Sequence, residues 1–228
     1  MRYLALATDY DATLATDGAV DPDTVEALRR LAATGRKLVL VTGRQLGDLL
    51  LAFPQAAIFD AVVAENGAVL YRPQSRETRV LAQSPSPQFV QALRRRGVAP
   101  LWVGQVVVAT VQPNETRVME VIRELGLDLQ VILNKGSVMV LPASVDKATG
   151  LSAALDDLGL SAQSVVAIGD AENDQAFLAM CGCGVAVANA LDRVKAGAKH
   201  VTRGEAGAGV REIIDSLISD DLQGDVPR

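Results

Sequence analysis

Two carboxylates, Asp9 and Asp11, stand one residue apart directly after the apolar run Tyr3 to Ala7. The run predicts a short buried strand, and residues i and i+2 of an extended segment project to the same side. The two carboxylates are therefore expected to converge at the carboxyl end of a strand, where open α/β sheets place their ligands. Like charges held together need a cation or a shared proton. Acidic residues are also common in ordinary strand-to-loop turns, so the pair alone leaves both interpretations open.

Polar residues suited to the same chemistry follow three further predicted elements. Thr42-Gly43-Arg44 follows a strand, although Thr42 taken alone is better explained as the N-cap of the next helix. Lys147 lies in the first turn of a predicted helix, where the dipole disfavours a cation, so it is either solvated or directed at an anion. The segment Gly169 to Asp174 ends a strand and enters a helix. A capped helix explains Asp170 or Asp174 there, but not all the polar groups of the segment.

Alternating strand and helix patterns supply the frame for these residues, and they predict a doubly wound α/β sheet. Asp21-Pro22 is typical of a helix start, and Glu65-Asn66-Gly67 of a tight turn between strands. The predicted elements are a helix from Asp21 to Gly35, a strand Lys37 to Val41, a helix Gln45 to Phe53, strands Ala61 to Ala64 and Ala68 to Tyr71, a helix Asp146 to Leu158, a strand Val165 to Ile168, a helix Asp174 to Met180, a strand Gly184 to Val187, and helices Leu191 to Ala198 and Gly209 to Ile218.

The rhythm changes between about residues 80 and 146. A stiff Ser84-Pro85-Ser86-Pro87 linker leads into a helix that ends near Gly97. The pattern then predicts a strand from Val103 to Val111, a helix from Glu115 to Leu125, and a hairpin whose turn is Asn134-Lys135-Gly136. This order fits a small antiparallel sheet with helices on one face, inserted into the larger unit.

Composition limits the class of partner. The hydrophobic share of 49% with 4% aromatic residues suits a parallel sheet between helices. The net charge of −5 does not favour nucleic acid or an anionic membrane as a partner. No secretory segment or ~20-residue apolar span is evident, so a cytoplasmic protein is expected, with Cys181 and Cys183 as reduced core thiols. His200 is interpreted as structural, and the tail Asp220 to Arg228 as frayed.

The order and strand-end placement of the four polar elements resemble the haloacid dehalogenase-like (HAD) superfamily over nearly the whole chain. Asp9 to Thr13 resembles motif I, Thr42 motif II, Lys147 motif III, and Gly169 to Asp174 motif IV. Glu65-Asn66-Gly67-Ala68 before the insert and Leu141 to Lys147 after it resemble the type IIB or Cof-like branch. The short insert is similar to that of small-capped phosphoglycolate phosphatase-like members.

The resemblance implies a fold and a function. The fold is a doubly wound parallel-sheet HAD-like core, made of residues 1–79 and 147–228, with an inserted α+β cap at residues 80–146 that selects the substrate. The branch consists mainly of magnesium-dependent phosphatases of small phosphoesters. The implied function is a phosphomonoesterase that acts on a small phosphorylated metabolite, such as a sugar phosphate or phosphoglycolate, through an aspartyl-phosphate. A monomer or homodimer is expected.

Roles follow from the same resemblance. Asp9 is expected to be the nucleophile and Asp11 the acid and base, while Thr42 and Lys147 hold the phosphoryl oxygens. Mg²⁺ is expected on the Asp9 carboxylate, the Asp11 carbonyl and Asp170, with Asp174 orienting its ligands. Expected substrate contacts are Thr13, Gly43, Arg44, Glu65, Asn66 and Asn173. On the cap, Asn134 and Lys135 are candidates to reach inward, although a solvated turn is the better explanation for this pair.

One residue departs from the pattern, and two other functions stay open. Family members usually carry glycine where this chain has Ala12, and glycine eases unusual backbone angles. A sugar phosphomutase of the same branch would need a cap that grips a second phosphate, which the short insert disfavours. A non-catalytic domain that binds phosphorylated ligands is the other alternative, and the intact acidic residues weigh against it.

Overall fold

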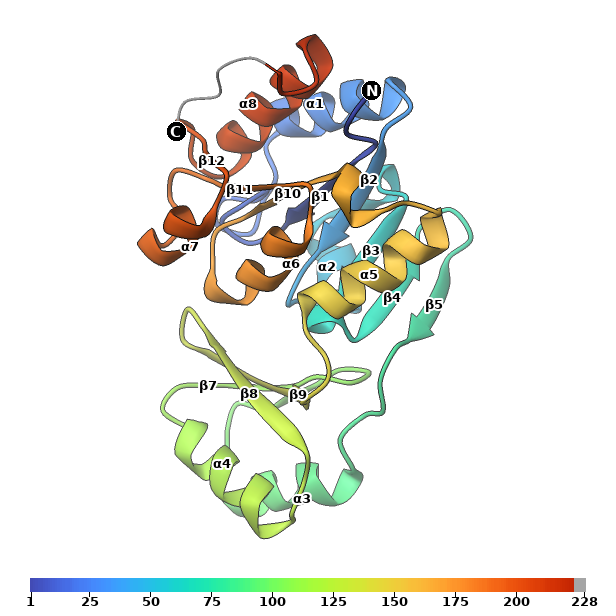
Figure 1. Cartoon of the computed structure of the whole chain (residues 1–228). Coiled ribbons are helices and arrows are strands. Elements are labelled where there is room, and N and C mark those ends of the chain that lie inside the picture. The colour runs from blue at the N-terminus through green and yellow to red at the C-terminus, as the bar shows by residue number, and fades with distance from the viewer. Residues whose placement is uncertain (224–228) are drawn as a thin grey trace.

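The computed structural model describes residues 1–223, which form two β-sheets with separate hydrophobic cores (Figure 1). The tail expected to be frayed therefore lies partly outside the described residues. The larger sheet has eight strands in the order β12-β11-β10-β1-β2-β3-β4-β5, parallel from β12 to β3 and antiparallel at β4 and β5. Its strands are β1 (Ala5–Asp9), β2 (Lys37–Val41), β3 (Ala61–Ala64), β4 (Val69–Arg72), β5 (Glu77–Val80), β10 (Val165–Gly169), β11 (Cys183–Ala186) and β12 (His200–Val201).

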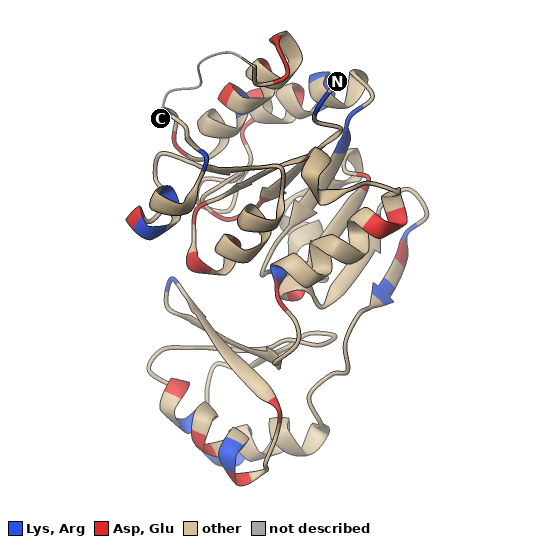
Figure 2. Cartoon of the chain, viewed as in Figure 1, with Lys and Arg blue, Asp and Glu red and all other residues tan. Residues whose placement is uncertain are grey.

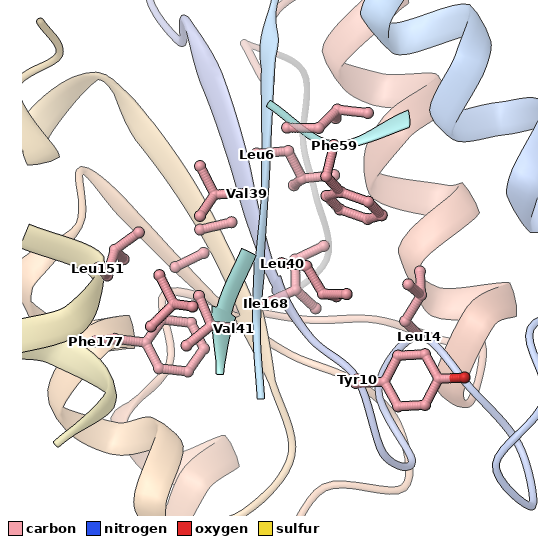
Figure 3. Close-up of a cluster of buried hydrophobic side chains, with 14 of the residues drawn as sticks. Leu6, Tyr10, Leu14, Val39, Leu40, Val41, Phe59, Leu151, Ile168 and Phe177 are labelled. Carbon is pink, nitrogen blue, oxygen red and sulfur yellow. The ribbon is translucent and has the colours of Figure 1, made fainter. Parts of the chain in front are cut away.

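Strand β1 lies at the centre of this sheet, and all five of its residues are buried. A strand covered on both faces needs apolar side chains on both, which the run before Asp9 supplies. Figure 3 shows the result: Val39 and Val41 point toward Leu151 and Phe177 on one face. Leu6 and Leu40 lie on the opposite face, with Phe59. The predicted doubly wound α/β architecture is therefore confirmed.

Helices cover both faces of the larger sheet, and two of them, α1 and α5, begin with the expected side-chain caps. The Asp21 side chain accepts a hydrogen bond from the Thr24 N–H at 2.9 Å, with Pro22 as the first helical residue. The Asp146 side chain accepts from the Thr149 N–H at 2.7 Å. These helices are α1 (Pro22–Ala33), α2 (Leu46–Ala52), α5 (Lys147–Leu158), α6 (Gln175–Met180), α7 (Asp192–Gly197) and α8 (Ala206–Ser219), with short 3-10 turns at Pro54–Ile58, Glu65–Gly67, Ala162–Ser164 and Glu172–Asp174.

The smaller sheet is antiparallel, with the strand order β6-β7-β9-β8. Two helices pack on it and close a second core around Phe89 and Val118. Acidic and basic residues alternate along the outer helix α4 (Figure 2), which marks a solvated face. The elements are α3 (Pro87–Arg95), β6 (Trp102–Val103), β7 (Val108–Val111), α4 (Glu115–Glu124), β8 (Leu129–Asn134) and β9 (Ser137–Pro142).

One predicted strand was wrong, and β5 and β12 were not predicted. The strand expected from Val103 to Val111 is a hairpin, in which residues 104–107 form the loop between β6 and β7. Strand β5 was missed because its residues are exposed and carry charges rather than an apolar alternation. By contrast, the hairpin around Asn134-Lys135-Gly136 is confirmed. Its turn residues Lys135 and Gly136 have φ values of 47° and 83°, as a tight two-residue turn requires.

No helix within residues 1–223 combines the length and apolar character needed to cross a membrane. Cys181 and Cys183 are free, buried thiols. Burial raises the pKa of Cys181 to about 12, which keeps that sulfur protonated and unreactive at neutral pH.

Helix α5 packs on the turn after β3 through two glycines. A Cβ atom on Gly150 would lie 2.4 Å from the Gly67 Cα atom and 2.7 Å from the Gly67 carbonyl oxygen. Overpacking of this kind typically costs about 1–3 kcal/mol. We expect Gly150→Ala to lower the free energy of unfolding by at least that amount, as measured by urea denaturation. Gly47→Ala is the control, because a Cβ atom there meets nothing within 4 Å. Equal stability of the two variants would contradict the close packing.

Candidate active site

Lys147 contacts carboxylates from an early and a late segment of the chain, at the carboxyl edge of the larger sheet. Its Nζ atom lies 2.6 Å from Asp9 Oδ1 and 2.6 Å from Asp174 Oδ1. The three side chains are almost completely buried, with exposed fractions of 2%, 6% and 0%. Asp9 ends β1, Lys147 begins α5, and Asp174 stands between β10 and α6. The lysine is therefore directed at anions and is not solvated.

Burial and charge oppose each other in this group. Burial raises the pKa of the Asp9 carboxyl to about 7, although the Lys147 ammonium lowers it. Burial also acts to lower the pKa of Lys147, but the charges of Asp174 and Asp9 overcome it and raise that pKa above its usual value. A buried ammonium that stays protonated is thus the counterion that lets buried carboxylates ionise.

Asp170 faces the same point from β10. Its Oδ1 accepts a hydrogen bond from Thr13 Oγ1 at 3.1 Å, and its Oδ2 lies 2.7 Å from Lys135 Nζ. That ammonium also lies 3.4 Å from the carbonyl oxygen of Asp11. Lys135 comes from the tip of the β8–β9 hairpin, which points at the larger sheet and is coloured as basic in Figure 2. The Asp170 carboxylate and the Asp11 carbonyl thus converge on one cation.

This donor set fits a hard divalent cation. Asp9, Asp170 and Asp174 each offer a carboxylate oxygen, and these atoms lie within 4.8 Å of one another. Oxygen donors of this kind suit Mg²⁺, Ca²⁺ or Mn²⁺. The Asp11 carbonyl adds a further oxygen where the Lys135 ammonium now contacts it. The side chain of Asp11, in contrast, is outside this cluster.

The Asp11 carboxylate is bound by Arg44 instead. The Arg44 Nε and one terminal nitrogen donate to the two carboxylate oxygens at 2.8 and 2.6 Å, a bidentate arrangement. The guanidinium carbon also lies 5.0 Å from the centre of the Tyr10 ring. Directly after Asp11, Ala12 has a φ of 64°, a left-handed conformation that costs an L-residue about 1–2 kcal/mol. This conformation explains why glycine suits the position.

Asn189, a residue that was not predicted from the sequence, binds the loop that contains Ala12. Its side-chain N–H donates to the Ala12 carbonyl at 2.7 Å, and its side-chain oxygen accepts from the Ala206 N–H at 2.7 Å. The residue joins the loop after β1 to the start of α8. No motif or spacing in the sequence marks it, because an asparagine after a strand is common in any turn.

The remaining predicted residues meet around the turn after β3. The N-cap of α2 is Gln45 and not Thr42. The Thr42 hydroxyl instead accepts a hydrogen bond from the Arg44 N–H at 3.1 Å. The Asn66 side chain accepts from the Asn173 side chain at 2.9 Å and donates to Met139 Sδ. A Cβ atom on Gly43 would lie 3.3 Å from the Asn66 amide. Glu65 faces away from the carboxylate cluster, toward the backbone of residues 105–107.

A cavity of about 220 Å³ opens over these groups. The larger sheet and its loops contribute Asp9, Asp11, Arg44 and Lys147 to its lining. The smaller sheet contributes Trp102, Val107, Ala109, Thr110, Asn134, Ser137 and Met139. Drug-sized ligands typically need roughly 300–1,000 Å³, so a cavity of this size suits a small molecule whose charged group meets Lys147.

We expect Lys147→Met to destabilise the protein by about 3–5 kcal/mol, because it leaves buried carboxylates without their counterion. The loss should be smaller near pH ~5 than near pH ~8. Without the lysine, the folded-state pKa of the Asp9 carboxyl, already raised by burial, lies further above its unfolded value, so stability falls as the pH rises through that window. Urea denaturation in EDTA at both pH values measures the difference.

Lys37→Met is the matched control. Lys37 lies 2.8 Å from Asp60 with 46% of its side chain exposed, and exposed pairs contribute about 0–1 kcal/mol. A loss in Lys147→Met that does not change between the two pH values would contradict the role of Lys147 as a counterion.

Comparison with known proteins agrees with this geometry. The family model for haloacid dehalogenase-like hydrolases matches residues 6–125 and 112–214. The chain is 31% identical over 219 residues to a phosphoglycolate phosphatase of Methanothermobacter thermautotrophicus, covering 92% of this chain and 96% of that protein. It is 32% identical over 203 residues to a phosphoglycolate phosphatase of Halorubrum lacusprofundi, covering 81% and 84%.

A solved structure shares the fold. A haloacid dehalogenase-like hydrolase from Bacteroides thetaiotaomicron superposes with a TM-score of 0.81 at 22% identity, covering 94% of this chain and 99% of that one. The match of the family model over most of the sequence, with carboxylates and a lysine gathered at the carboxyl ends of β1 and β10, identifies the chain as a member of the haloacid dehalogenase-like hydrolase family.

Proposed function

We propose that the chain is a magnesium-dependent phosphomonoesterase that hydrolyses a small phosphorylated metabolite through an aspartyl-phosphate on Asp9. The observation that carries the proposal is the buried Asp9–Lys147–Asp174 group beneath a small cavity. A nucleophilic carboxylate must be ionised, and Lys147 favours that state. The names of the two relatives support phosphoglycolate as a substrate to test first.

The chain's own residues supply each step of this mechanism. Asp9 attacks phosphorus through a carboxylate oxygen, and the bond from phosphorus to the ester oxygen breaks. Asp11 gives its proton to the departing oxygen, then takes one from the water that attacks the phosphorus of the aspartyl-phosphate. The bond from phosphorus to the Asp9 oxygen then breaks, which releases inorganic phosphate and restores the carboxylate. Lys147 and the Thr42 hydroxyl hold phosphoryl oxygens as charge develops on them.

Magnesium would be held by Asp9, Asp170 and the Asp11 carbonyl, with Asp174 beside them, and would offset the charge of the phosphate and carboxylates. Asp174 also fixes the loop that carries Asp170: its Oδ2 accepts from the backbone N–H groups of Asp170 and Ala171, each at 2.9 Å. Asp174 would thus position the Asp170 loop as well as add negative charge beside the metal.

The bidentate contact with Arg44 has a consequence for Asp11. Both oxygens of the Asp11 carboxylate are occupied by N–H donors of Arg44, so neither is available to the departing oxygen of a substrate. The role of Asp11 as an acid therefore requires Arg44 to turn away, and an anionic substrate group in the cavity would attract the guanidinium. Arg44 is then a substrate contact of the bound state, and Thr13 acts on Asp170 rather than on the substrate.

We also propose that residues 80–146 act as the cap of a core formed by residues 1–79 and 147–228. The smaller sheet forms one wall of the cavity, and its Lys135 contacts the acidic cluster directly. The side of the substrate away from the phosphate would then meet residues of this cap.

Purified protein is expected to release phosphate from p-nitrophenyl phosphate only with Mg²⁺, with activity lost in EDTA and restored by added metal. Asp9→Asn should reduce turnover to background, because the nucleophile is removed. Asp11→Asn should reduce kcat by about 100–10,000-fold, the usual contribution of an acid–base group. Steady-state phosphate release measures both.

Asp215→Asn is the control, because this exposed carboxylate pairs with Arg30 on the surface and should keep full activity. Equal turnover by Asp9→Asn and the original protein, or activity indifferent to chelator, would reject the proposal. A panel of phosphoglycolate, hexose phosphates and sucrose phosphate would then rank substrates. With a hexose 1-phosphate, formation of hexose 6-phosphate in place of inorganic phosphate would indicate a mutase.

A further inference from the structure

The Glu65 carboxylate binds the backbone of the smaller sheet. The side chain is buried, with 1% of the residue exposed. Its Oε1 accepts from the Gln105 N–H at 3.0 Å, and its Oε2 accepts from the Val106 and Val107 N–H groups at 2.7 and 2.8 Å. Three consecutive N–H groups that point at one carboxylate form an anion-binding nest. The two partners belong to different sheets, since residues 104–107 join β6 to β7.

The loop is shaped to receive this side chain. A Cβ atom on Gly104 would lie 2.7 Å from both carboxylate oxygens of Glu65, so only glycine allows the loop to approach this closely. Each of the three donors needs an acceptor, and a carboxylate presents acceptors on both of its oxygens. A glutamine would turn an N–H₂ group toward at least one backbone N–H.

Backbone hydrogen bonds to residues 42 and 44 fix the turn that carries Glu65. Glu65 and Asn66 each have a φ of 53°, a strained conformation that persists only where surrounding contacts impose it. Here the Glu65 N–H donates to the Arg44 carbonyl and the Asn66 N–H to the Thr42 carbonyl, each at 3.0 Å. The strained turn directs the Glu65 side chain toward the loop.

The loop in turn places one wall of the cavity. Val107 ends the loop and lines the cavity, and Trp102, Ala109 and Thr110 line it from the two strands that the loop connects. The positions of these four lining residues therefore depend on where residues 104–107 are held.

We infer that Glu65 is a positioning residue that clamps the 104–107 loop and thereby forms the leaving-group side of the substrate site. Its effect on substrate rests on the proposed phosphatase function, whereas the clamp itself does not. Glu65 acts on the substrate through the loop, without touching the phosphoryl group.

Two variants test the clamp from its two sides. Glu65→Gln changes the carboxylate, and Gly104→Ala forces the loop away while leaving Glu65 in place. In both, we expect the amide hydrogens of residues 105–107 to exchange at least about tenfold faster, while those of β1 and β10 keep their protection. With p-nitrophenyl phosphate and Mg²⁺, KM should rise about tenfold and kcat should change less than about threefold, since binding is affected and chemistry is not.

Glu77→Gln and Gly47→Ala are the matched controls, because Glu77 is exposed and a Cβ atom on Gly47 meets no neighbour. Unchanged exchange at residues 105–107 in Gly104→Ala would overturn the inference. The inference would also be overturned if Glu65→Gln lost amide protection throughout the larger sheet while Gly104→Ala lost no protection at residues 105–107. If the original protein releases no phosphate but the loop amides still respond, the phosphatase proposal fails and the clamp stands.

Discussion

Three buried carboxylates share a small volume at the carboxyl edge of the larger sheet, and the Lys147 ammonium lies between two of them. Charges removed from water need a partner, so this lysine must be delivered to one position. It stands at the start of α5, where the helix dipole alone would disfavour it. The Asp146 cap sets where the helix begins, and the contact between Gly67 and Gly150 sets how closely it approaches the sheet.

The same edge explains why distant segments cooperate. Parallel strands align their carboxyl ends, so the loops after β1, β2, β3 and β10 open on one side. Backbone hydrogen bonds join two of these loops, because the Glu65 and Asn66 N–H groups donate to the Arg44 and Thr42 carbonyls. The smaller sheet then closes that side, with Lys135 at its hairpin tip and the 104–107 loop at its other end.

Much of the fold follows from local patterns, whereas side-chain direction across the two sheets does not. The alternation of strands and helices, the caps at Asp21 and Asp146, and the Asn134-Lys135-Gly136 hairpin could be predicted, because each depends on neighbours in the chain. The break at residues 104–107 was missed, although Gly104-Gln105 interrupts the apolar run, because the carboxylate that binds this loop is distant in the sequence. The pairing of Arg44 with Asp11 likewise depends on a geometry that spacing alone does not contain.

The place of β1 in the sheet also constrains how a nascent chain can fold. One edge of β1 pairs with β2, which is synthesised soon after it, and the other pairs with β10, which begins only at Val165. Until that late strand leaves the ribosome, β1 presents an open row of backbone donors and acceptors, a known route to intermolecular pairing. The smaller sheet is complete by Pro142, so its core can assemble before the edge that carries the carboxylate cluster exists.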